Sequence, residues 1–288
     1  MKGISVAIAA PIEPVCPEDV RLSVLDLIRD HSTAIAEVRG ELETDPLFDA
    51  NKHDDLWILR FILSHKKKTK SAVKAAKYTL GFRAQHRLDN LDIRDTPPHK
   101  VPEGRVKEYY DVRCFKNRCI VMVPDKQRGA ISYVDLGGHI PGCSQKVEYD
   151  TWEQGYIYTS EWTHQWLDFV TRTTGRLTKS IRIIDMKTAS MAFFDRHDMK
   201  YDSTVMEKME DCYPQLLESI SACNTPSWIH IIWALGRKIM PKRVVEKFDI
   251  INPKQNQAER DRLHKYISEE NLPVEYGGVN DSPYSGKW

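Results

Sequence analysis

The sequence has no hydrophobic run long enough to cross a bilayer. No apolar stretch in its 288 residues approaches the ~20 residues that a transmembrane helix needs, so any membrane contact is expected to be peripheral. Residues 1–17 carry three prolines, and their apolar stretch is shorter and weaker than that of a typical signal peptide. We interpret this segment as a flexible leader, with a secretory signal as the less favoured alternative.

Cysteine pairs are missing as well. The six cysteines are scattered without a C-x-x-C motif, in a chain long enough to bury a core without disulfides. Cys114 and Cys119 with His139 or His164 match no tetrahedral zinc spacing. The pattern predicts reduced, buried thiols in a cytoplasmic protein with no metal site and no cofactor.

The common catalytic motifs are absent. The sequence lacks G-x-G-x-x-G, G-x-x-x-x-G-K-[ST], G-x-S-x-G and H-E-x-x-H, which argues against nucleotide chemistry and the commonest hydrolases. Gly137-Gly138-His139 precedes Pro141 rather than a helix start and is interpreted as a turn. His197, in Asp195-Arg196-His197-Asp198, is interpreted as part of a solvated charged loop. We therefore predict that the protein is not an enzyme.

The chain has almost no net charge, but the two signs are segregated. Lys and Arg number 42 and Asp and Glu 41, giving a formal charge of +1. Residues 13–55 hold twelve acids and four Lys or Arg, whereas the block from Leu56 to Leu88 holds nine basic residues and no acid. This basic block indicates either a solvated helix face or a surface for anionic lipid headgroups. Nucleic acid is disfavoured because no aromatic residues alternate with the charges.

Hydrophobic periodicity changes after the Thr96-Pro97-Pro98 loop. Before it, helical spacing predicts helices within Glu18–Leu42, Asp54–Leu63 and Thr69–His86. After residue 115, strand patterns alternate with helical ones, which favours an α/β layer with partly parallel pairing. The predicted strands are Cys119–Val123, Ala130–Leu136, Ser180–Met186, Ile220–Cys223 and Phe248–Ile251, and the helices are Thr151–Val170, Asp202–Leu217 and Pro226–Met240.

The last of these helices is unusually apolar. The segment Pro226–Met240 is hydrophobic on nearly every face and is too short to span a membrane. Trp228 and Trp233, followed by Arg237 and Lys238, give it the composition favoured at a membrane interface. It is either a buried core helix or a helix that meets lipid.

Several segments together resemble the CRAL-TRIO lipid-binding proteins, which include phosphatidylinositol and tocopherol transfer proteins and retinaldehyde carriers. The most specific segment is Asn271-Leu272-Pro273-Val274-Glu275-Tyr276-Gly277-Gly278, and the similarity extends over about residues 45–279. The other matching segments occur in the family's order: Leu59–Leu63, Gly129–Gly137, Ile183–Lys187, Tyr213-Pro214 and Asn224-Thr225-Pro226.

The resemblance implies a helical subdomain (18–98) followed by an α/β lipid-binding domain (99–280). In such a domain a mixed sheet forms the floor of an apolar cavity, and a lid helix covers it. The lid would carry Trp228, Ile231, Ile232, Trp233 and Leu235.

The same resemblance suggests ligand-binding residues. Lys247 lies where phosphoinositide-binding members hold a phosphate, Arg243 is one helical turn earlier, and Lys66 matches a basic position of the N-terminal motif. Ser180 matches a residue of phosphatidylcholine-binding members. Arg182 replaces the threonine expected beside it, and an inward Arg182 would need an anionic partner.

Other positions depart from the phosphatidylinositol pattern. His65, Val244 and Gln215 stand where Arg, Thr and Glu are usual, which puts phosphatidylinositol itself in doubt. The helix before the central strand is rich in rings, including Tyr158, Trp162 and Trp166. These aromatic residues fit core packing or a rigid isoprenoid ligand such as a retinoid or tocopherol.

We therefore expect a cytoplasmic, non-enzymatic lipid carrier that associates peripherally with membranes. It would transfer one hydrophobic ligand, a phospholipid or phosphoinositide, by opening its lid at an anionic membrane, and it would act as a monomer without nucleic acid. A retinoid, tocopherol or other isoprenoid carrier is the alternative within this class. A lipid-regulated protein-interaction module is the alternative from another class.

Overall fold

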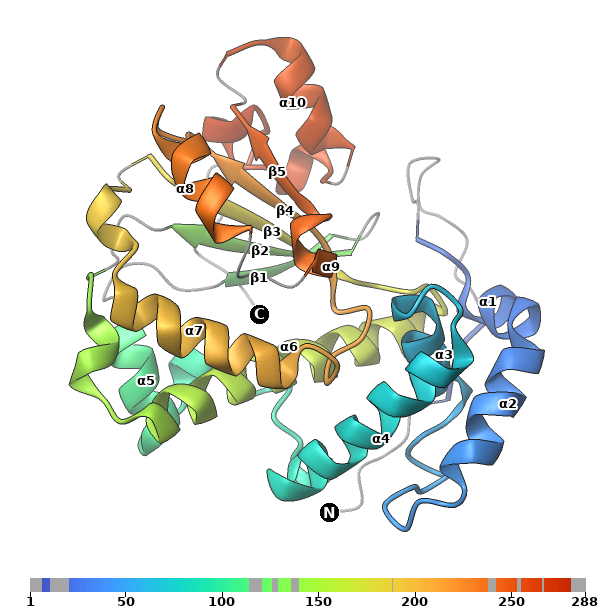
Figure 1. The fold of residues 1–288 in the computed structure, drawn as a ribbon. Coiled ribbons are helices and arrows are strands. Elements are labelled where there is room, and N and C mark those ends of the chain that lie inside the picture. Colours follow the sequence, from blue (N-terminus) through green and yellow to red (C-terminus); the bar gives the residue numbers. More distant parts are fainter. Residues whose placement is uncertain are drawn as a thin grey trace.

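Helices make up the N-terminal part of the chain, and strands alternate with helices in the rest (Figure 1). The computed structural model describes residues 7–10, 21–113, 121–125, 129–135, 140–187, 189–237, 242–252, 255–265 and 267–280. Within these ranges the α-helices are α1 (Val24–Asp30), α2 (Ser32–Leu42), α3 (Asp55–Ser64), α4 (Thr69–Gln85), α5 (Arg105–Arg113), α6 (Tyr149–Thr174), α7 (Arg196–Met209), α8 (Ile229–Gly236), α9 (Lys242–Val245) and α10 (Gln257–His264). Short 3₁₀ turns lie at Leu88–Asn90 (η1), Pro98–Lys100 (η2), Cys143–Lys146 (η4), Met191–Phe193 (η5), Glu269–Asn271 (η6) and Val274–Tyr276 (η7).

The first four helices share one hydrophobic core. Their starts follow from capping residues: the Ser23 side chain accepts a hydrogen bond from the Asp26 backbone N–H, and Asp54 accepts one from that of Trp57. α3 is apolar around most of its circumference and is buried over most of its length. The predicted helices of this region are confirmed.

Five strands form one mixed sheet in the order β1-β2-β3-β4-β5. The strands are β1 (Val121–Asp125), β2 (Gly129–Asp135), β3 (Ser180–Asp185), β4 (Leu217–Cys223) and β5 (Phe248–Ile251). β1 runs antiparallel to β2, whereas β2, β3, β4 and β5 run parallel to one another. Helices connect the parallel strands, as crossover connections require: α6 follows β2, α7 follows β3, and α8 with α9 follows β4.

The two faces of the sheet are covered differently (Figure 1). On one face, Ile181 and Ile183 of β3 form a cluster with residues of α10 and the C-terminal segment, including Leu263 and Tyr276. On the other face, Ile184 of β3 packs in a cluster with residues of α8 and its surroundings. Successive residues of a strand point to opposite faces, so Ser180 and Arg182 share the α8 side with Ile184.

Both predicted bounds of one helix were wrong. The helix predicted at Asp202–Leu217 begins at Arg196 because the Asp195 side chain caps it, accepting from the His197 and Asp198 backbone N–H groups. It ends at Met209, after which Pro214 and the left-handed Gln215 (φ 60°) turn the chain into β4. Asp198 is buried, so the segment 195–198 is a helix start and not a solvated loop.

None of the helices that the structure describes is both long enough and apolar enough to cross a membrane.

Candidate functional site

The eight-residue helix α8 lies on the sheet face that carries Arg182 (Figure 1). The Trp233 ring stacks on Phe248 of β5, with centroids 4.0 Å apart and planes 17° from parallel. At the other end, Trp228 meets Phe194 edge-on, with centroids 6.0 Å apart, and Ile229 is buried. Two indoles and one aliphatic side chain therefore hold α8 against the sheet and the segment after η5.

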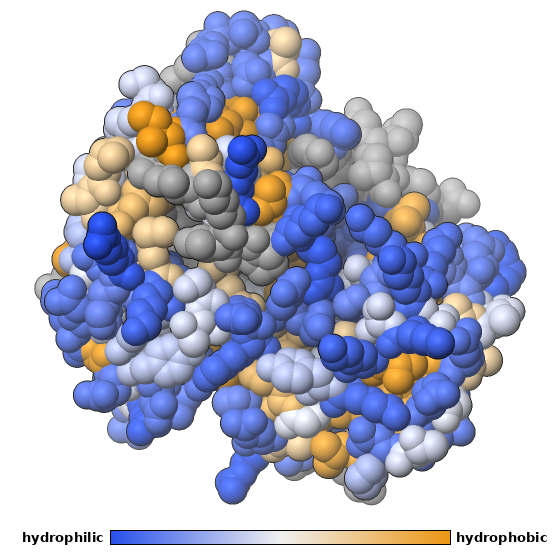
Figure 2. Space-filling model, viewed as in Figure 1, coloured by the Kyte–Doolittle hydropathy of each residue, from blue (hydrophilic) through white to orange (hydrophobic). Residues whose placement is uncertain are grey.

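The outer surface of α8 exposes apolar side chains beside His230. The Ile231 side chain is 63% exposed, and Met191 of the neighbouring η5 turn is 53% exposed. Figure 2 shows hydrophobic residues near α8 on this face of the molecule, beside hydrophilic ones. Ile232 and Leu235 also belong to α8, and their side chains lie outside the described ones. α8 is shorter than the predicted Pro226–Met240 helix, of which residues 238–240 lie outside the described ranges.

The start of α8 is anchored through Asp185 at the end of β3. This carboxylate accepts hydrogen bonds from the Tyr276 hydroxyl (2.5 Å), the Asn224 side-chain amide (3.1 Å) and the Lys187 backbone N–H (2.8 Å). Asn224 has a left-handed conformation (φ 51°) just before α8. The central strand, the Asn224-Thr225-Pro226 segment and the C-terminal segment, which the sequence identified separately, thus meet at one buried carboxylate. Nothing in the sequence indicated that Tyr276 pairs with Asp185.

Lys247 lies directly before β5, among other cations. Its ammonium donates a hydrogen bond to the Leu217 carbonyl. Burial lowers the pKa of Lys247, and the positive charges of Lys179 and Arg243 lower it further, while Glu218 opposes them. Among the described residues, no carboxylate lies within ion-pair distance of Lys247. An anion here would relieve the mutual repulsion of these cations.

Arg243 and Lys66 lie near this position but are paired. Arg243, in α9, contacts Asp211 at 2.6 Å and Glu210 at 3.1 Å. The Lys66 ammonium lies 3.9 Å from Glu246 and is 75% exposed. Arg243 therefore lies near enough to Lys247 for its charge to act on it. Lys66 lies against Glu246, the residue directly before Lys247.

The turn between α3 and α4 joins the helical part to this region. Lys66 and Lys67 have left-handed backbones there (φ 52° and 65°). The His65 ring lies 3.4 Å from Asp211, and the Gln215 amide donates to the Ser64 hydroxyl at 3.0 Å. His65 and Gln215, which depart from the family pattern, thus both join the α3–α4 turn to the segment between α7 and β4.

Ser180 and Arg182 are placed on the α8 side of the sheet. Ser180 is 1% exposed, and its hydroxyl has no hydrogen-bond partner among the described residues. The Arg182 Nε atom is buried and likewise lacks a partner there. The Tyr156 phenol of α6 is near enough for the charge of Arg182 to act on its pKa, which burial raises.

The aromatic residues of α6 point in different directions. The Tyr158 hydroxyl donates to the Thr96 carbonyl (2.8 Å), and the Trp162 indole donates to the Arg94 carbonyl (3.0 Å). Trp166 packs in the same cluster. Tyr158 is two residues after Tyr156, which places it about 200° around the helix from the ring near Arg182. Tyr158, Trp162 and Trp166 therefore face the 91–96 segment and not Arg182. Tyr158 also lines a separate pocket of about 340 Å³.

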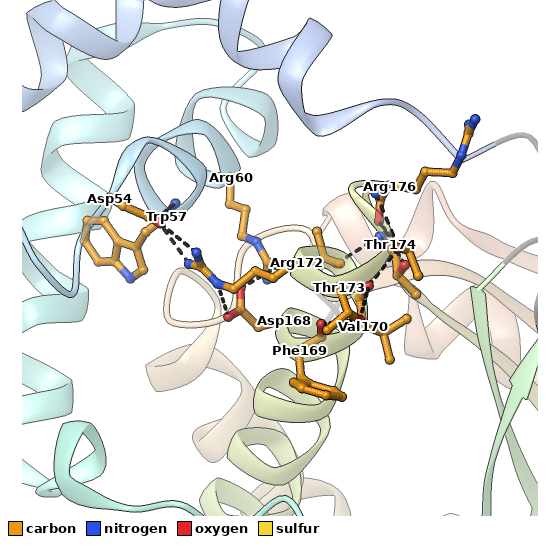
Figure 3. A network of polar contacts seen from close by, with 12 residues as sticks. Asp54, Trp57, Arg60, Asp168, Phe169, Val170, Arg172, Thr173, Thr174 and Arg176 are labelled. Atoms are coloured by element: carbon orange, nitrogen blue, oxygen red, sulfur yellow. Dashed lines mark hydrogen bonds and ion pairs between the residues drawn. The ribbon is translucent and has the colours of Figure 1, made fainter. Parts of the chain in front are cut away.

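A buried polar network connects α3 with α6 (Figure 3). Arg172 bridges Asp54 at 2.6 Å and Asp168 at 2.7 Å, and Arg60 lies 3.0 Å from Asp168. Arg60 is buried, as is Arg83, which pairs with Glu161. Two of the nine cations in the basic block are therefore internal and hold the helical part to α6, while the exposed members include Lys66, Lys67, Lys68, Lys70 and Lys74.

His164 lies within this network and is held neutral. Burial lowers its pKa from 6.5 to about 4, and the charge of Arg60 adds to the effect, while Glu161 and Asp168 oppose it. The unfolded chain binds this proton more readily, so stability should fall as pH drops from 6.5 towards about 4.

Replacing His164 with glutamine should flatten that pH dependence. We expect the wild-type free energy of unfolding to fall by about 1 kcal/mol per pH unit more than that of His164→Gln over this range. Urea titrations at a series of pH values measure it. Equal slopes in the two proteins would show that His164 is not held neutral by burial.

One serine contacts a histidine, but its environment is structural. The Ser144 hydroxyl lies 2.6 Å from His197 Nδ1 and 2.5 Å from an Asp198 carboxylate oxygen. Asp198 also accepts from the Gly142 and Ser144 backbone N–H groups, and Ser144 is fully buried. The cluster ties η4 to the start of α7 and gives a substrate no access to the hydroxyl. Among the described residues, no three His, Cys, Asp or Glu side chains are grouped to hold a metal ion.

An N-terminal helical layer followed by a mixed α/β sheet with an apolar covering helix is the architecture of a lipid-binding domain. The CRAL/TRIO domain profile matches residues 116–278, more than half of the chain, and the protein belongs to this family of lipid-binding proteins. The Cys114, Cys119 and Gly137–His139 positions interpreted above lie outside the described ranges.

Relatives with similar sequences are the patellins of Arabidopsis thaliana. The chain is 22% identical to patellin-3 over 253 residues, which cover 83% of this chain and 45% of patellin-3. It is 21% identical to patellin-1 over 287 residues, covering 95% of this chain and 41% of patellin-1. The chain thus spans less than half the length of these relatives. The crystal structure of Sfh5 matches with a TM-score of 0.54 and 15% identity, covering 90% of this chain and 88% of Sfh5, which shows a shared fold.

Proposed function

We propose that this protein carries one lipid, a phospholipid or phosphoinositide, between membranes and holds it beneath α8. The observation that supports this most is the position of α8: a short apolar helix on the sheet face, with Ile231 exposed on its outer side. A helix that is apolar on both sides can exchange its contact with the sheet for contact with acyl chains.

Carriage needs such an exchange because lipid chains leave a bilayer at high cost. At ~0.8 kcal/mol per methylene, a chain of ~16 carbons faces a penalty near ~13 kcal/mol for entering water. If α8 moves away from the sheet only at a membrane, the chain passes from bilayer to protein without crossing water. The Asp185 contacts to Asn224 and Tyr276 support a fixed pivot at the start of α8.

The charged surface supports docking on an anionic membrane. Lys66, Lys67, Lys68, Lys70 and Lys74 are exposed along the α3–α4 turn and α4. Each basic residue near an anionic membrane surface contributes about 1 kcal/mol of attraction before salt screens it.

Mass spectrometry of organic extracts from the purified protein tests the proposal. We expect one lipid per chain, together with transfer of a pyrene-labelled phospholipid between vesicle populations. Recovery of no lipid and no uptake from vesicles would contradict carriage. Stoichiometric lipid without transfer would support a lipid-regulated interaction module, and a recovered retinoid or tocopherol would replace the phospholipid.

Removing two cations near β5 should weaken binding to phosphoinositide vesicles. We expect Lys247→Ala with Arg243→Ala to weaken binding about thirtyfold at low salt, because each charge contributes about 1 kcal/mol near an anionic headgroup. Co-sedimentation with vesicles containing phosphatidylinositol 4-phosphate measures this.

The matched control is Lys52→Ala with Lys200→Ala. It removes the same charge from two exposed positions elsewhere. If both double variants lose binding equally, the effect is one of net charge. If neither loses binding, Lys247 and Arg243 do not form a headgroup site.

A further inference from the structure

Ser71 carries an exposed hydroxyl within a strongly basic segment. It lies in the first turn of α4, and its side chain is open to solvent. Residues 66–74 contain five lysines and no Asp or Glu. Four of these lysines precede Ser71, and Lys68 lies three residues before it. A serine with lysines on its N-terminal side fits protein kinases whose peptide groove is acidic, because such kinases select their substrates by charge.

The lysines around Ser71 are exposed and hold few carboxylates. Among the described residues, only Lys66 of this set lies within ion-pair distance of a carboxylate, with its ammonium 3.9 Å from Glu246. Arg60 and Arg83 of the same basic block are instead buried in ion pairs. The positive charge beside Ser71 is therefore open both to a kinase and to an anionic membrane.

Thr69, the other hydroxyl residue among these lysines, is less suited to carry a phosphate. Its hydroxyl donates a hydrogen bond to the Glu37 carboxylate at 2.6 Å, so a phosphate at this position would face a negative charge. Its side chain is also less exposed than that of Ser71. Ser71 is thus the more accessible hydroxyl and the one with the more favourable electrostatic surroundings.

The start of α4 favours a negative charge on Ser71. The first backbone N–H groups of a helix lack intrahelical acceptors, and the dipole of this 17-residue helix attracts an anion to its N-terminal end. The N-cap residue Lys68 offers no side-chain hydrogen bond there. Lys74 lies three residues after Ser71, on the same side of the helix. A phosphoserine carries about −1.5 to −2 charges at pH 7, so it would offset about two of the surrounding lysines.

We infer that Ser71 is a phosphorylation site for a protein kinase that selects basic sequences, and that its phosphate weakens docking on anionic membranes. In the reaction, the Ser71 oxygen bonds to the γ-phosphorus of magnesium-bound ATP while the bond from that phosphorus to the β–γ bridging oxygen breaks. ADP leaves, and the hydroxyl proton passes to the catalytic aspartate of the kinase. The regulatory part rests on the proposed function, which uses the same lysines for docking, and adds a switch for it.

Phosphorylation in vitro tests the site. The full chain is incubated with magnesium, ATP and the catalytic fragment of protein kinase C, and its peptides are mapped by mass spectrometry. We expect one phosphate per chain, on Ser71, and none on Ser71→Ala. Casein kinase 2, which selects acidic sequences, is the control kinase and should leave Ser71 unmodified. Absence of phosphate from Ser71, or faster modification of Thr69, would overturn the assignment.

Co-sedimentation with vesicles containing phosphatidylserine tests the effect on docking. At low salt we expect the phosphorylated protein to bind about thirtyfold more weakly than the unmodified one, as for the loss of two membrane-facing cations. Ser71→Ala treated with the same kinase should bind as the unmodified wild type does. Ser71→Glu should weaken binding about fivefold because it adds a single negative charge. Thr96→Glu adds that charge at an exposed position before η2 and should bind as wild type.

The outcomes separate the two proposals. If Ser71 is phosphorylated and vesicle binding does not change, the switch is wrong and carriage stands. If Ser71→Glu and Thr96→Glu weaken binding equally, the effect is one of net charge and the switch is wrong as well. If the unmodified protein binds anionic vesicles no better than neutral ones, the docking step of the proposed function itself fails.

Discussion

Replacing Ile231 with aspartate is expected to slow lipid transfer between vesicles at least tenfold while leaving the free energy of unfolding nearly unchanged. Ile231 is 63% exposed on the outer side of α8, so its removal opens no cavity in the core. At a membrane, the carboxylate would have to enter the region of the acyl chains. The difference between isoleucine and aspartate is about 3 kcal/mol at the bilayer centre and smaller at its edge. Transfer of pyrene-labelled phosphatidylinositol from donor vesicles containing phosphatidylserine measures the rate.

Val279→Asp is the matched control for that experiment. Val279 is 62% exposed, like Ile231, but lies in the C-terminal segment, where its backbone bonds to Glu269. The same kind of charge change there should leave transfer unaffected. Equal slowing by both variants would mean that added negative charge repels the vesicles and that α8 has no special part in transfer.

Replacing Glu161 with alanine is expected to lower the free energy of unfolding by about 3 kcal/mol, the scale of breaking a buried ion pair. The Glu161 carboxylate accepts from both terminal nitrogens of Arg83, at 2.9 and 3.1 Å, and is fully buried. Burial by itself raises the pKa of Glu161, but the charge of Arg83, the ring of His164 and the hydrogen bonds from Arg83 and Gln165 together outweigh it, and the net shift is downward. Arg83 would keep Asp89 but lose this second partner. Urea denaturation measures the loss.

Two further variants make that prediction specific. Asp92→Ala removes an exposed partner of Arg94 and should cost less than about 1 kcal/mol, as exposed pairs do. Arg83→Met with Glu161→Leu removes both buried charges and should recover much of the lost stability. Failure of the double variant to exceed Glu161→Ala would show that the loss comes from packing or from Gln165, whose amide also donates to Glu161.

The order of helices and strands could be predicted from the sequence because it depends on local periodicity. The strand Phe248–Ile251 was predicted with its observed bounds, and the helix Asp54–Leu63 within one residue at each end. The predicted end of α7 at Leu217 overlooked Pro214, which cannot continue a helix, and Leu217 belongs to β4 instead. β4 is stabilised by its neighbours β3 and β5, and these contacts are not local.

The candidate site was only partly accessible to sequence reasoning. Lys247, Arg243 and Lys66 were selected from the resemblance, and the structure places them near one another, but their role as a headgroup site is still a prediction. Tyr158, Trp162 and Trp166 share one side of α6, where Tyr158 and Trp162 donate hydrogen bonds to the 91–96 segment and Trp166 packs in the same cluster. The sequence left open which face of β3 meets the lid helix.

By itself, the sequence determined the class of this protein: helices first, an α/β layer after them, an apolar segment too short to span a membrane, and a cationic block. Each of these depends on the order of residues along the chain. Only the tertiary structure decided that Arg60 and Arg83 of that block are internal, that Tyr276 meets Asp185, and that Ser180 and Arg182 lie on the α8 side of the sheet. Burial and pairing are set by residues distant in sequence. Whether an arginine of this block is buried in an ion pair or exposed to solvent therefore depends on which element packs against it.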